Sequence, residues 1–241
     1  MEQSTLPTEI LFILDRSGSM SSIKTSVEAG VAAFIRKNRE LGGVCRATLV
    51  QFDSDHKDHM QLDTVYESCP LEEVPEFTLA YRGGTPLYDA VGLTLSRYEE
   101  MWAKSPNRPG KVIVMVLTDG GDTCSKELNA AGVESIVTRL QKDYGWEINY
   151  VGANQDAAKT AKSMGIHATR AATYSTSSPI AVAAAFEAMA EVSYESRSGI
   201  DTSTGPSLQA RYQTKMNHGL SHQTKATVGT ADLASLLDPK K

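Results

Sequence analysis

Three short stretches of this sequence carry oxygen-bearing side chains at spacings that indicate a cation site. The first is Asp15-x-Ser17-x-Ser19, which directly follows a run of apolar residues. The second holds Thr85 in GGTPLYDA, and the third holds Asp119 in LTDGGD. Carboxylate and hydroxyl oxygens, with no imidazole or thiolate among them, suit a hard dication such as Mg²⁺ or Mn²⁺ that retains bound waters. The chemistry indicated is therefore metal binding.

The elements that must position these residues alternate between strands and helices. Strands are predicted at residues 10–15, 47–53, 60–66, 112–118 and 147–153, with a weaker sixth at 167–173. The first and fourth are continuous apolar runs, typical of strands buried on both faces of a parallel sheet. The second and third are joined by a short polar link, which predicts a hairpin and hence one antiparallel strand.

Helices are predicted in the gaps between strands. Apolar residues fall on one helical face between residues 23 and 35, between 87 and 102, and between 133 and 140. Thr85-Pro86 and Ser178-Pro179 predict an N-cap followed by proline at the first helical position, the latter opening a helix over 180–194. The fold class expected is α/β: a doubly wound, Rossmann-like, mostly parallel sheet of about six strands with one antiparallel edge strand and helices on both faces.

This fold predicts that the three stretches converge. In an open doubly wound sheet, ligands bind outside the carboxyl ends of the strands, where the strand order reverses. If the first strand is central and the crossover after the hairpin returns to its other side, the strands ending at Asp15 and Asp119 are neighbours there. The helix starting at Pro86 has its amino end at the same edge, which brings Thr85 to the site.

The ordered set of Asp15, Ser17, Ser19, Thr85 and Asp119 resembles the metal-ion-dependent adhesion site (MIDAS) of von Willebrand factor type A domains, over roughly residues 5–197. The resemblance implies a complete site, with Ser17, Ser19 and Thr85 as hydroxyl ligands and both aspartates acting mainly through bound water. It also implies a binding protein rather than an enzyme. The cofactor would be Mg²⁺ or Mn²⁺, and an open coordination position would favour a Glu or Asp carboxylate of a protein partner.

Composition bounds the class of protein and its partners. The chain has 241 residues, of which 41% are hydrophobic and 22% are charged, as in ordinary globular proteins. A net charge of −5 gives no electrostatic footprint for nucleic acid. Neither a signal peptide nor a membrane span is visible, and the three cysteines form no CxxC pair. We therefore expect a cytoplasmic or virion-associated protein that binds neither nucleic acid nor membranes.

The predicted organisation is a von Willebrand A-like domain over residues 5–198 and a polar C-terminal extension over residues 199–241. The extension is rich in Ser, Thr, Gly and Gln, which favours a segment that either wraps the domain or stays mobile. Residues 230–237 have the spacing of a short amphipathic helix. This extension is a candidate docking tail.

The leading hypothesis is a divalent-cation-dependent protein-binding module that captures an acidic side chain, as part of an intracellular or viral assembly. The partner would be a ring ATPase or a larger particle. Two alternatives stay open: a metal-dependent hydrolase of phosphate esters, and a structural subunit that docks through its C-terminal tail. GxSxG, P-loop and GxGxxG motifs are absent from the sequence.

Other polar residues near these stretches are interpreted without a role in metal binding. His56 and His59, set among three aspartates, have a spacing that suits a transition metal, but a hairpin tip is more typically a solvated turn. Asp122, close behind Asp119, is interpreted as a solvated loop acid. Cys124 is interpreted as a bystander, because no second cysteine or histidine is adjacent.

Overall fold

Six strands form one sheet in the computed structural model, which describes residues 6–153 and 156–220. They are β1 (Thr8–Asp15), β2 (Cys45–Ser54), β3 (Met60–Pro70), β4 (Lys111–Thr118), β5 (Glu147–Ala153) and β6 (Ala171–Tyr174). Their order is β3-β2-β1-β4-β5-β6. Among these six described strands, only the β2–β3 pair is antiparallel. The predicted fold class is confirmed, and β1 lies beside β4 as expected.

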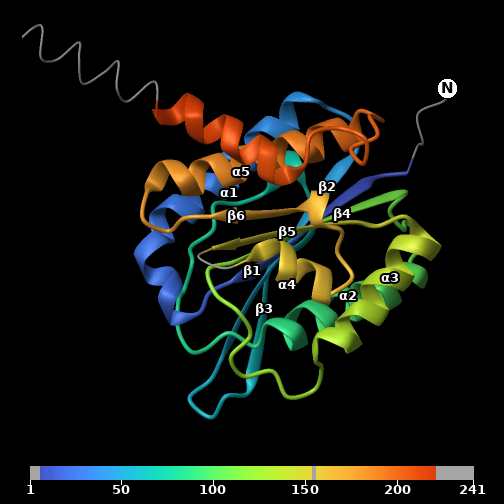
Figure 1. Cartoon of the computed structure of the whole chain (residues 1–241). Coiled ribbons are helices and arrows are strands. Elements are labelled where there is room, and N and C mark those ends of the chain that lie inside the picture. Colours follow the sequence, from blue (N-terminus) through green and yellow to red (C-terminus); the bar gives the residue numbers. More distant parts are fainter. Residues whose placement is uncertain (1–5, 154–155, 221–241) are drawn as a thin grey trace, which may run out of the picture.

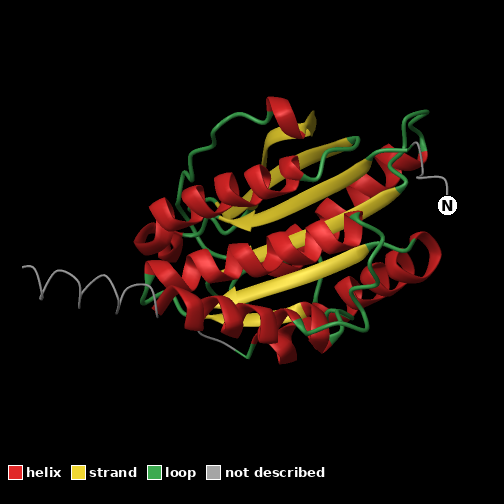
Figure 2. Cartoon of the chain, turned by 90° about the horizontal axis from the view of Figure 1, so that it is seen from above, coloured by secondary structure: helices red, strands yellow, loops and turns green. Residues whose placement is uncertain are grey.

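Helices cover both faces of the sheet (Figure 1). They are α1 (Lys24–Glu40), α2 (Leu87–Ala103), α3 (Ala130–Tyr144), α4 (Ala157–Ser163) and α5 (Pro179–Arg197). The buried residues of α1 and α5 pack on one face, and those of α2, α3 and α4 pack on the other. Figure 2 shows helices running alongside the strands that they cover. Among the described residues, no helix is long and apolar enough to cross a membrane.

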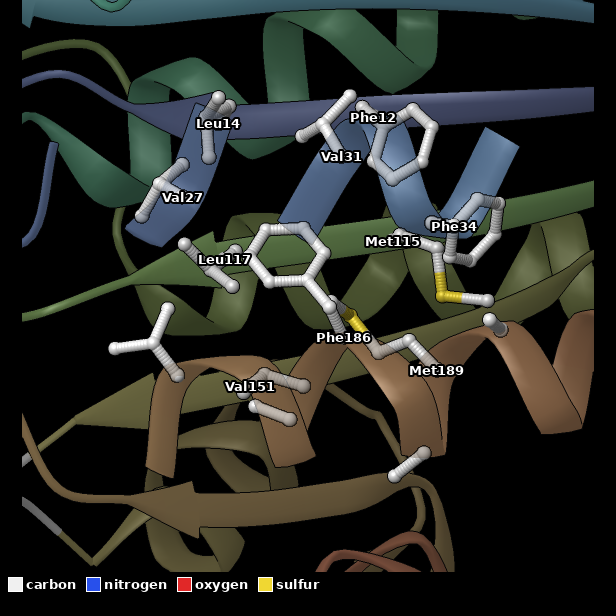
Figure 3. Packing of buried hydrophobic residues seen from close by; sticks show 14 of the residues in the cluster. Phe12, Leu14, Val27, Val31, Phe34, Met115, Leu117, Val151, Phe186 and Met189 are labelled. Atoms are coloured by element: carbon white, nitrogen blue, oxygen red, sulfur yellow. The ribbon is translucent and has the colours of Figure 1, made fainter. Parts of the chain in front are cut away.

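The position of β1 inside the sheet explains why its sequence is apolar without interruption. Phe12 and Leu14 point into the cluster formed with α1 and α5 (Figure 3), whereas Leu11 and Ile13 belong to the cluster on the opposite face. A strand covered on both faces has no solvent-facing side, so polar alternation is lost. The strand is therefore buried along its whole length except at its first residue, Thr8, which is partly exposed.

The beginnings of α2 and α5 show how tertiary contacts decide a helix start. The Ser178 hydroxyl accepts a hydrogen bond from the Ile180 amide at 3.2 Å, and Pro179 is the first helical residue, which confirms the predicted cap. The predicted Thr85 cap was wrong, because α2 begins at Leu87 without a side-chain cap. The Thr85 amide donates to the Thr123 hydroxyl and the Thr85 carbonyl accepts from the Thr123 amide, both at 2.9 Å. These two bonds hold Thr85 outside the helix.

Residues 200–220 pack against the domain. A helix at residues 208–220 places Leu208 and Tyr212 in the same buried cluster as α1 and α5. The Arg211 side chain, 4% exposed, forms ion pairs with Glu191 and Glu195 on α5. The domain boundary at 198/199 stays a prediction. The amphipathic segment 230–237 lies outside the described residues.

The helix at residues 208–220 also contacts the edge strand β6 through Gln209. The Thr173 amide of β6 donates to the Gln209 side-chain oxygen at 2.6 Å, and the Gln209 side-chain amide donates to the Thr173 carbonyl at 3.5 Å. An edge strand otherwise presents unpaired main-chain groups to other chains. Gln209 satisfies two of these groups.

Candidate metal centre

The loop after β1 and the loop after β4 meet through side-chain oxygens at the carboxyl edge of the sheet. The Ser17 and Ser19 hydroxyl oxygens are 3.1 Å apart, and the Ser19 hydroxyl donates to Asp119 Oδ1 at 2.7 Å. The Ser17 amide donates to Asp15 Oδ1 at 2.7 Å, which turns the loop back over the strand end. The structure thus brings Asp15, Ser17, Ser19 and Asp119 together, as the sequence predicts.

Thr85 reaches the same edge through bonds of the backbone around it. The Gly18 amide donates to the Gly83 carbonyl at 3.1 Å, which ties the loop before α2 to the first serine loop. The bonds between Thr85 and Thr123 tie the same segment to the loop after β4. Thr85 is 5% exposed, and its hydroxyl does not cap α2. The segment that holds Thr85 is therefore bonded to both loops that carry the other four predicted residues.

Asp15 is a buried acid held by neutral groups. It is wholly buried, and its second oxygen accepts from the Thr118 hydroxyl at 2.6 Å. Burial raises the pKa of Asp15 to about 6, against the lowering effect of the Thr118 and Ser17 hydrogen bonds. Burial also raises the pKa of Asp119. Both carboxyls therefore sit where their ionised forms are under-stabilised by the protein alone.

Tyr174, at the end of β6, places a buried hydroxyl near the two carboxylates. Its side chain is 2% exposed, and its hydroxyl has no hydrogen-bond partner within the described part of the chain. Burial, and then the Asp119 and Asp15 charges, raise the Tyr174 pKa well above its usual value. The negative charges of Asp119 and Asp15 therefore disfavour ionisation of Tyr174.

The donor set fits a hard dication. Neither Asp15 nor Asp119 forms an ion pair with any of the described residues. The adjacent Arg16 guanidinium instead lies 3.1 Å from Asp53 Oδ1 and 2.9 Å from Asp63 Oδ2. Two carboxylates and three hydroxyls without a basic partner match the oxygen ligands that Mg²⁺ and Mn²⁺ prefer.

Asp122 differs from its interpretation as a solvated loop acid. It is half-buried, and its Oδ1 accepts hydrogen bonds from the Tyr88 amide and the Ser125 hydroxyl. Asp89 on α2 reciprocates by accepting from the backbone amides of residues 126–128. Asp122 therefore connects the loop after β4 to the first turn of α2. This connection fixes the loop that carries Asp119 relative to the segment that carries Thr85. Cys124 is half-buried beside Gly84.

The hairpin tip between β2 and β3 is a hydrogen-bonded turn. Asp55 Oδ1 accepts from the Lys57 and His59 amides at 2.8 and 2.9 Å, and Asp55 Oδ2 lies 3.2 Å from His59 Nδ1. Across the residues that the structure describes, no three His, Cys, Asp or Glu side chains form a group that could hold a metal ion, so the hairpin tip has no transition-metal cluster of that kind. The geometry favours the turn interpretation.

Two residues at this edge of the sheet were not predicted from the sequence. Thr118 bonds to Asp15, but nothing in the sequence distinguishes it from an ordinary strand residue. Asp53 pairs with both Arg16 and Arg82. Its position at the carboxyl end of a strand next to β1 was an available indication, because the same rule identifies Asp15 and Asp119.

Comparison with known families agrees with this architecture. Residues 9–199 match the family model of the von Willebrand factor type A domain. The chain belongs to the von Willebrand factor type A family, whose domains are protein-interaction modules. A search of curated proteins found no match.

Solved structures share the fold at low sequence identity. The pilus adhesin SpaC of Lactobacillus rhamnosus GG, in an open conformation, is 16% identical with a TM-score of 0.57, over 80% of this chain and 31% of that one. Mussel byssus proximal thread matrix protein 1, with a zinc-occupied MIDAS motif, is 11% identical with a TM-score of 0.54, over 78% and 48%. A von Willebrand factor type A protein from Catenulispora acidiphila is 19% identical with a TM-score of 0.50, over 78% and 43%. The chain spans less than half the length of each of these proteins.

Proposed function

We propose that this chain is a protein-binding module that captures an acidic side chain of a partner through a divalent cation, Mg²⁺ or Mn²⁺. Asp15, Ser17, Ser19, Thr85 and Asp119 would hold the ion. The observation that carries the proposal is the convergence of the Asp15, Ser17, Ser19 and Asp119 oxygens from two loops, with the Thr85 segment bonded through its backbone to both loops. Within the described residues, neither carboxylate forms an ion pair. Membership of the von Willebrand factor type A family supports it.

The contacts suggest different tasks for the hydroxyls and the carboxylates. Both oxygens of Asp15 are engaged, one by the Ser17 amide and one by the Thr118 hydroxyl, so Asp15 is placed to orient bound water. Ser17, Ser19 and Thr85 offer neutral oxygens for direct contact. When bound, the dication would supply a positive centre for an anionic oxygen from outside. Neutral ligands would leave most of that charge available to the partner.

Metal binding is tested first, by calorimetric titration of the whole chain with Mg²⁺ and with Mn²⁺. We expect one site in the wild type and loss of binding in Ser17→Ala and in Asp119→Ala, because each removes an oxygen donor. Ser21→Ala is the matched control, since Ser21 is an exposed serine of the same loop. Equal affinity in all four proteins would contradict the site assignment.

The carboxylate step is tested with acetate and acetamide as probes. With Mn²⁺ bound, water-proton relaxation reports the waters on the ion. We expect acetate to lower this relaxation at concentrations where acetamide has no effect, because only acetate carries a negative charge. Free Mn²⁺ in the same buffers corrects for binding in solution. If acetate and acetamide behave alike on the protein, the proposed carboxylate recognition is wrong.

The wider context is part of the same proposal. A ring ATPase or larger particle as partner, the docking role of residues 199–241 and the cytoplasmic location stay predictions. The phosphate-ester hydrolase alternative has its own test, which is turnover of aryl phosphates by the Mn²⁺-loaded chain. Turnover that disappears in Asp119→Ala would favour the hydrolase over the binding module.

A further inference from the structure

The end of β2 forms a bracket between two of the metal-site loops. Asp53, which is wholly buried, accepts a hydrogen bond from Arg16 Nη2 at 3.1 Å and pairs through its other oxygen with Arg82 Nε. Arg16 lies between Asp15 and Ser17, and Arg82 lies three residues before Thr85. One buried carboxylate therefore holds an arginine from each of the two loops.

Main-chain bonds reinforce this connection on both sides. The Arg82 amide donates to the Arg16 carbonyl at 2.8 Å, and the Gly84 amide donates to the Ser54 hydroxyl at 2.8 Å. At Gly83, a Cβ would lie 1.8 Å from the Ser54 carbonyl oxygen. The segment before Thr85 is thus pressed directly onto the end of β2, and its position depends on that of Asp53 and Ser54.

Asp53 also holds the positively charged Arg16 guanidinium in place. Arg16 is 4% exposed and sits in the chain beside Asp15. Its remaining carboxylate partner, Asp63, is 58% exposed on its side chain, so solvent screens that pair strongly. Leaving a buried guanidinium without its partner is costly, so loss of Asp53 would favour pairing of Arg16 with another carboxylate within reach. Asp15, the residue that precedes Arg16 in the chain, is one of the expected metal ligands.

We propose that Asp53 is a positioning residue of the metal centre. It fixes the spacing between the serine loop and Thr85, and it keeps the Arg16 guanidinium from neutralising the carboxylates that would hold the cation. The inference rests on the proposed function, because it concerns the same metal site. It adds a residue outside the five expected ligands.

The first experiment compares the affinity of whole-chain variants for Mn²⁺, measured from the electron paramagnetic resonance of the free ion. We expect Asp53→Asn to weaken binding about 10- to 100-fold, the range found when residues supporting metal ligands are changed. Asp63→Asn is the matched control, because it removes only the exposed partner of Arg16, and we expect less than a threefold change. Circular dichroism in EDTA confirms that each variant is folded.

A double-variant cycle separates positioning from a general loss of stability. If Asp53 acts by placing Thr85, Asp53→Asn weakens binding much less in a Thr85→Ala background than in the wild type. Combining Asp53→Asn with Arg16→Gln should restore part of the lost affinity, because the competing guanidinium is gone. Additive effects in the first cycle together with no recovery in the second would overturn the proposal.

A milder variant keeps the test decisive if Asp53→Asn does not fold. The Arg82 side chain is 57% exposed, so Arg82→Gln removes one arm of the bracket with little loss of burial. We expect a smaller but measurable loss of Mn²⁺ affinity, and unchanged affinity would overturn the proposal. If the wild type itself binds neither Mg²⁺ nor Mn²⁺, the proposed function fails. If the wild type binds and these variants bind equally well, the role of Asp53 alone fails.

Discussion

The Ser19 hydroxyl lies 2.7 Å from the Asp119 carboxylate, although 100 residues separate them in the sequence. The contact exists because β1 and β4 are parallel neighbours whose last paired residues are Leu14 and Leu117. Both strands therefore leave the sheet at the same level, and the loops that follow meet. The order of the strands, rather than any local motif, creates the donor set.

Mg²⁺ should stabilise the native chain. A ligand that binds only the folded state stabilises it by about 2.7 kcal/mol at a hundredfold excess over its Kd. We expect a higher melting temperature in millimolar Mg²⁺ than in EDTA, measured by scanning calorimetry. Ser17→Ala combined with Ser19→Ala should abolish the difference, whereas Ser21→Ala should retain it. A shift of the same size in the double variant would show that the ion binds elsewhere.

Two glycines with similar backbone angles should differ sharply in their tolerance of alanine. Gly42 has φ +67° and nothing within 4 Å of an added Cβ, so Gly42→Ala should cost only the left-handed strain of about 1–2 kcal/mol. Gly83 has φ +62°, and a Cβ there would collide with the Ser54 carbonyl. We expect Gly83→Ala to cost at least roughly twice as much and to weaken Mg²⁺ binding. Urea unfolding and calorimetric titration measure the two effects, and equal costs would contradict the contact with β2.

Glu9 should make the protein less stable as the pH rises from 5 to 8. The side chain is 2% exposed, and its oxygens accept from the Thr48 and Ser68 hydroxyls at 2.6 and 3.2 Å. Burial raises the pKa of Glu9 from 4.5 to about 7. Between these values the folded chain holds a proton that the unfolded chain releases, so the unfolding free energy falls with rising pH. At about 1.36 kcal/mol per pKa unit, the full effect is on the order of 3 kcal/mol.

The measurement is urea unfolding in EDTA across this pH range. Asp15 contributes in the same direction, so the informative quantity is the difference between the wild type and Glu9→Gln, which retains the Asp15 part. We expect a shallower decline in Glu9→Gln, and a decline parallel to the wild type in the control Glu76→Gln, where the side chain is exposed. A parallel decline in Glu9→Gln would show that another group titrates.

The helix at residues 208–220 should contribute to the stability of the domain. Leu208 is 1% exposed within the cluster formed with α1 and α5, so Leu208→Ala should cost about 2–5 kcal/mol. Leu220 is 48% exposed, so Leu220→Ala should change stability by less than about 0.5 kcal/mol. Chemical unfolding compares the two variants. Equal small effects would mean that this helix detaches without loss to the domain.

Strand positions were predictable because the sequence records burial directly. The continuous apolar runs of β1 and β4 exist because both faces are covered, and the abrupt change to Asp15 and to Asp119 marks the carboxyl end of each strand. A general rule of open sheets then places both acids at one edge. The fold and the convergence of the loops after these two strands followed from these features.

Other features were not predictable because they depend on partners distant in sequence. Thr85-Pro86 and Ser178-Pro179 have the same local pattern, yet only Ser178 caps a helix, because Thr123 holds the backbone of Thr85. The pairing of Asp53 with two arginines likewise requires the folded loops. The helix at residues 208–220 does carry apolar residues at helical spacing, but polar composition around them dominates that segment.

The packing of Leu208 and Tyr212 also sets an order of events during synthesis. The chain emerges from the ribosome amino end first, so β1 through α5 are available before these two residues exist outside the exit tunnel. Until then the outer face of α5 and the free edge of β6 stay open, with Glu191 and Glu195 lacking Arg211. Folding of the domain is therefore completed by its carboxyl-terminal residues. A nascent chain halted near residue 200 would expose the apolar surface that Leu208 and Tyr212 later cover.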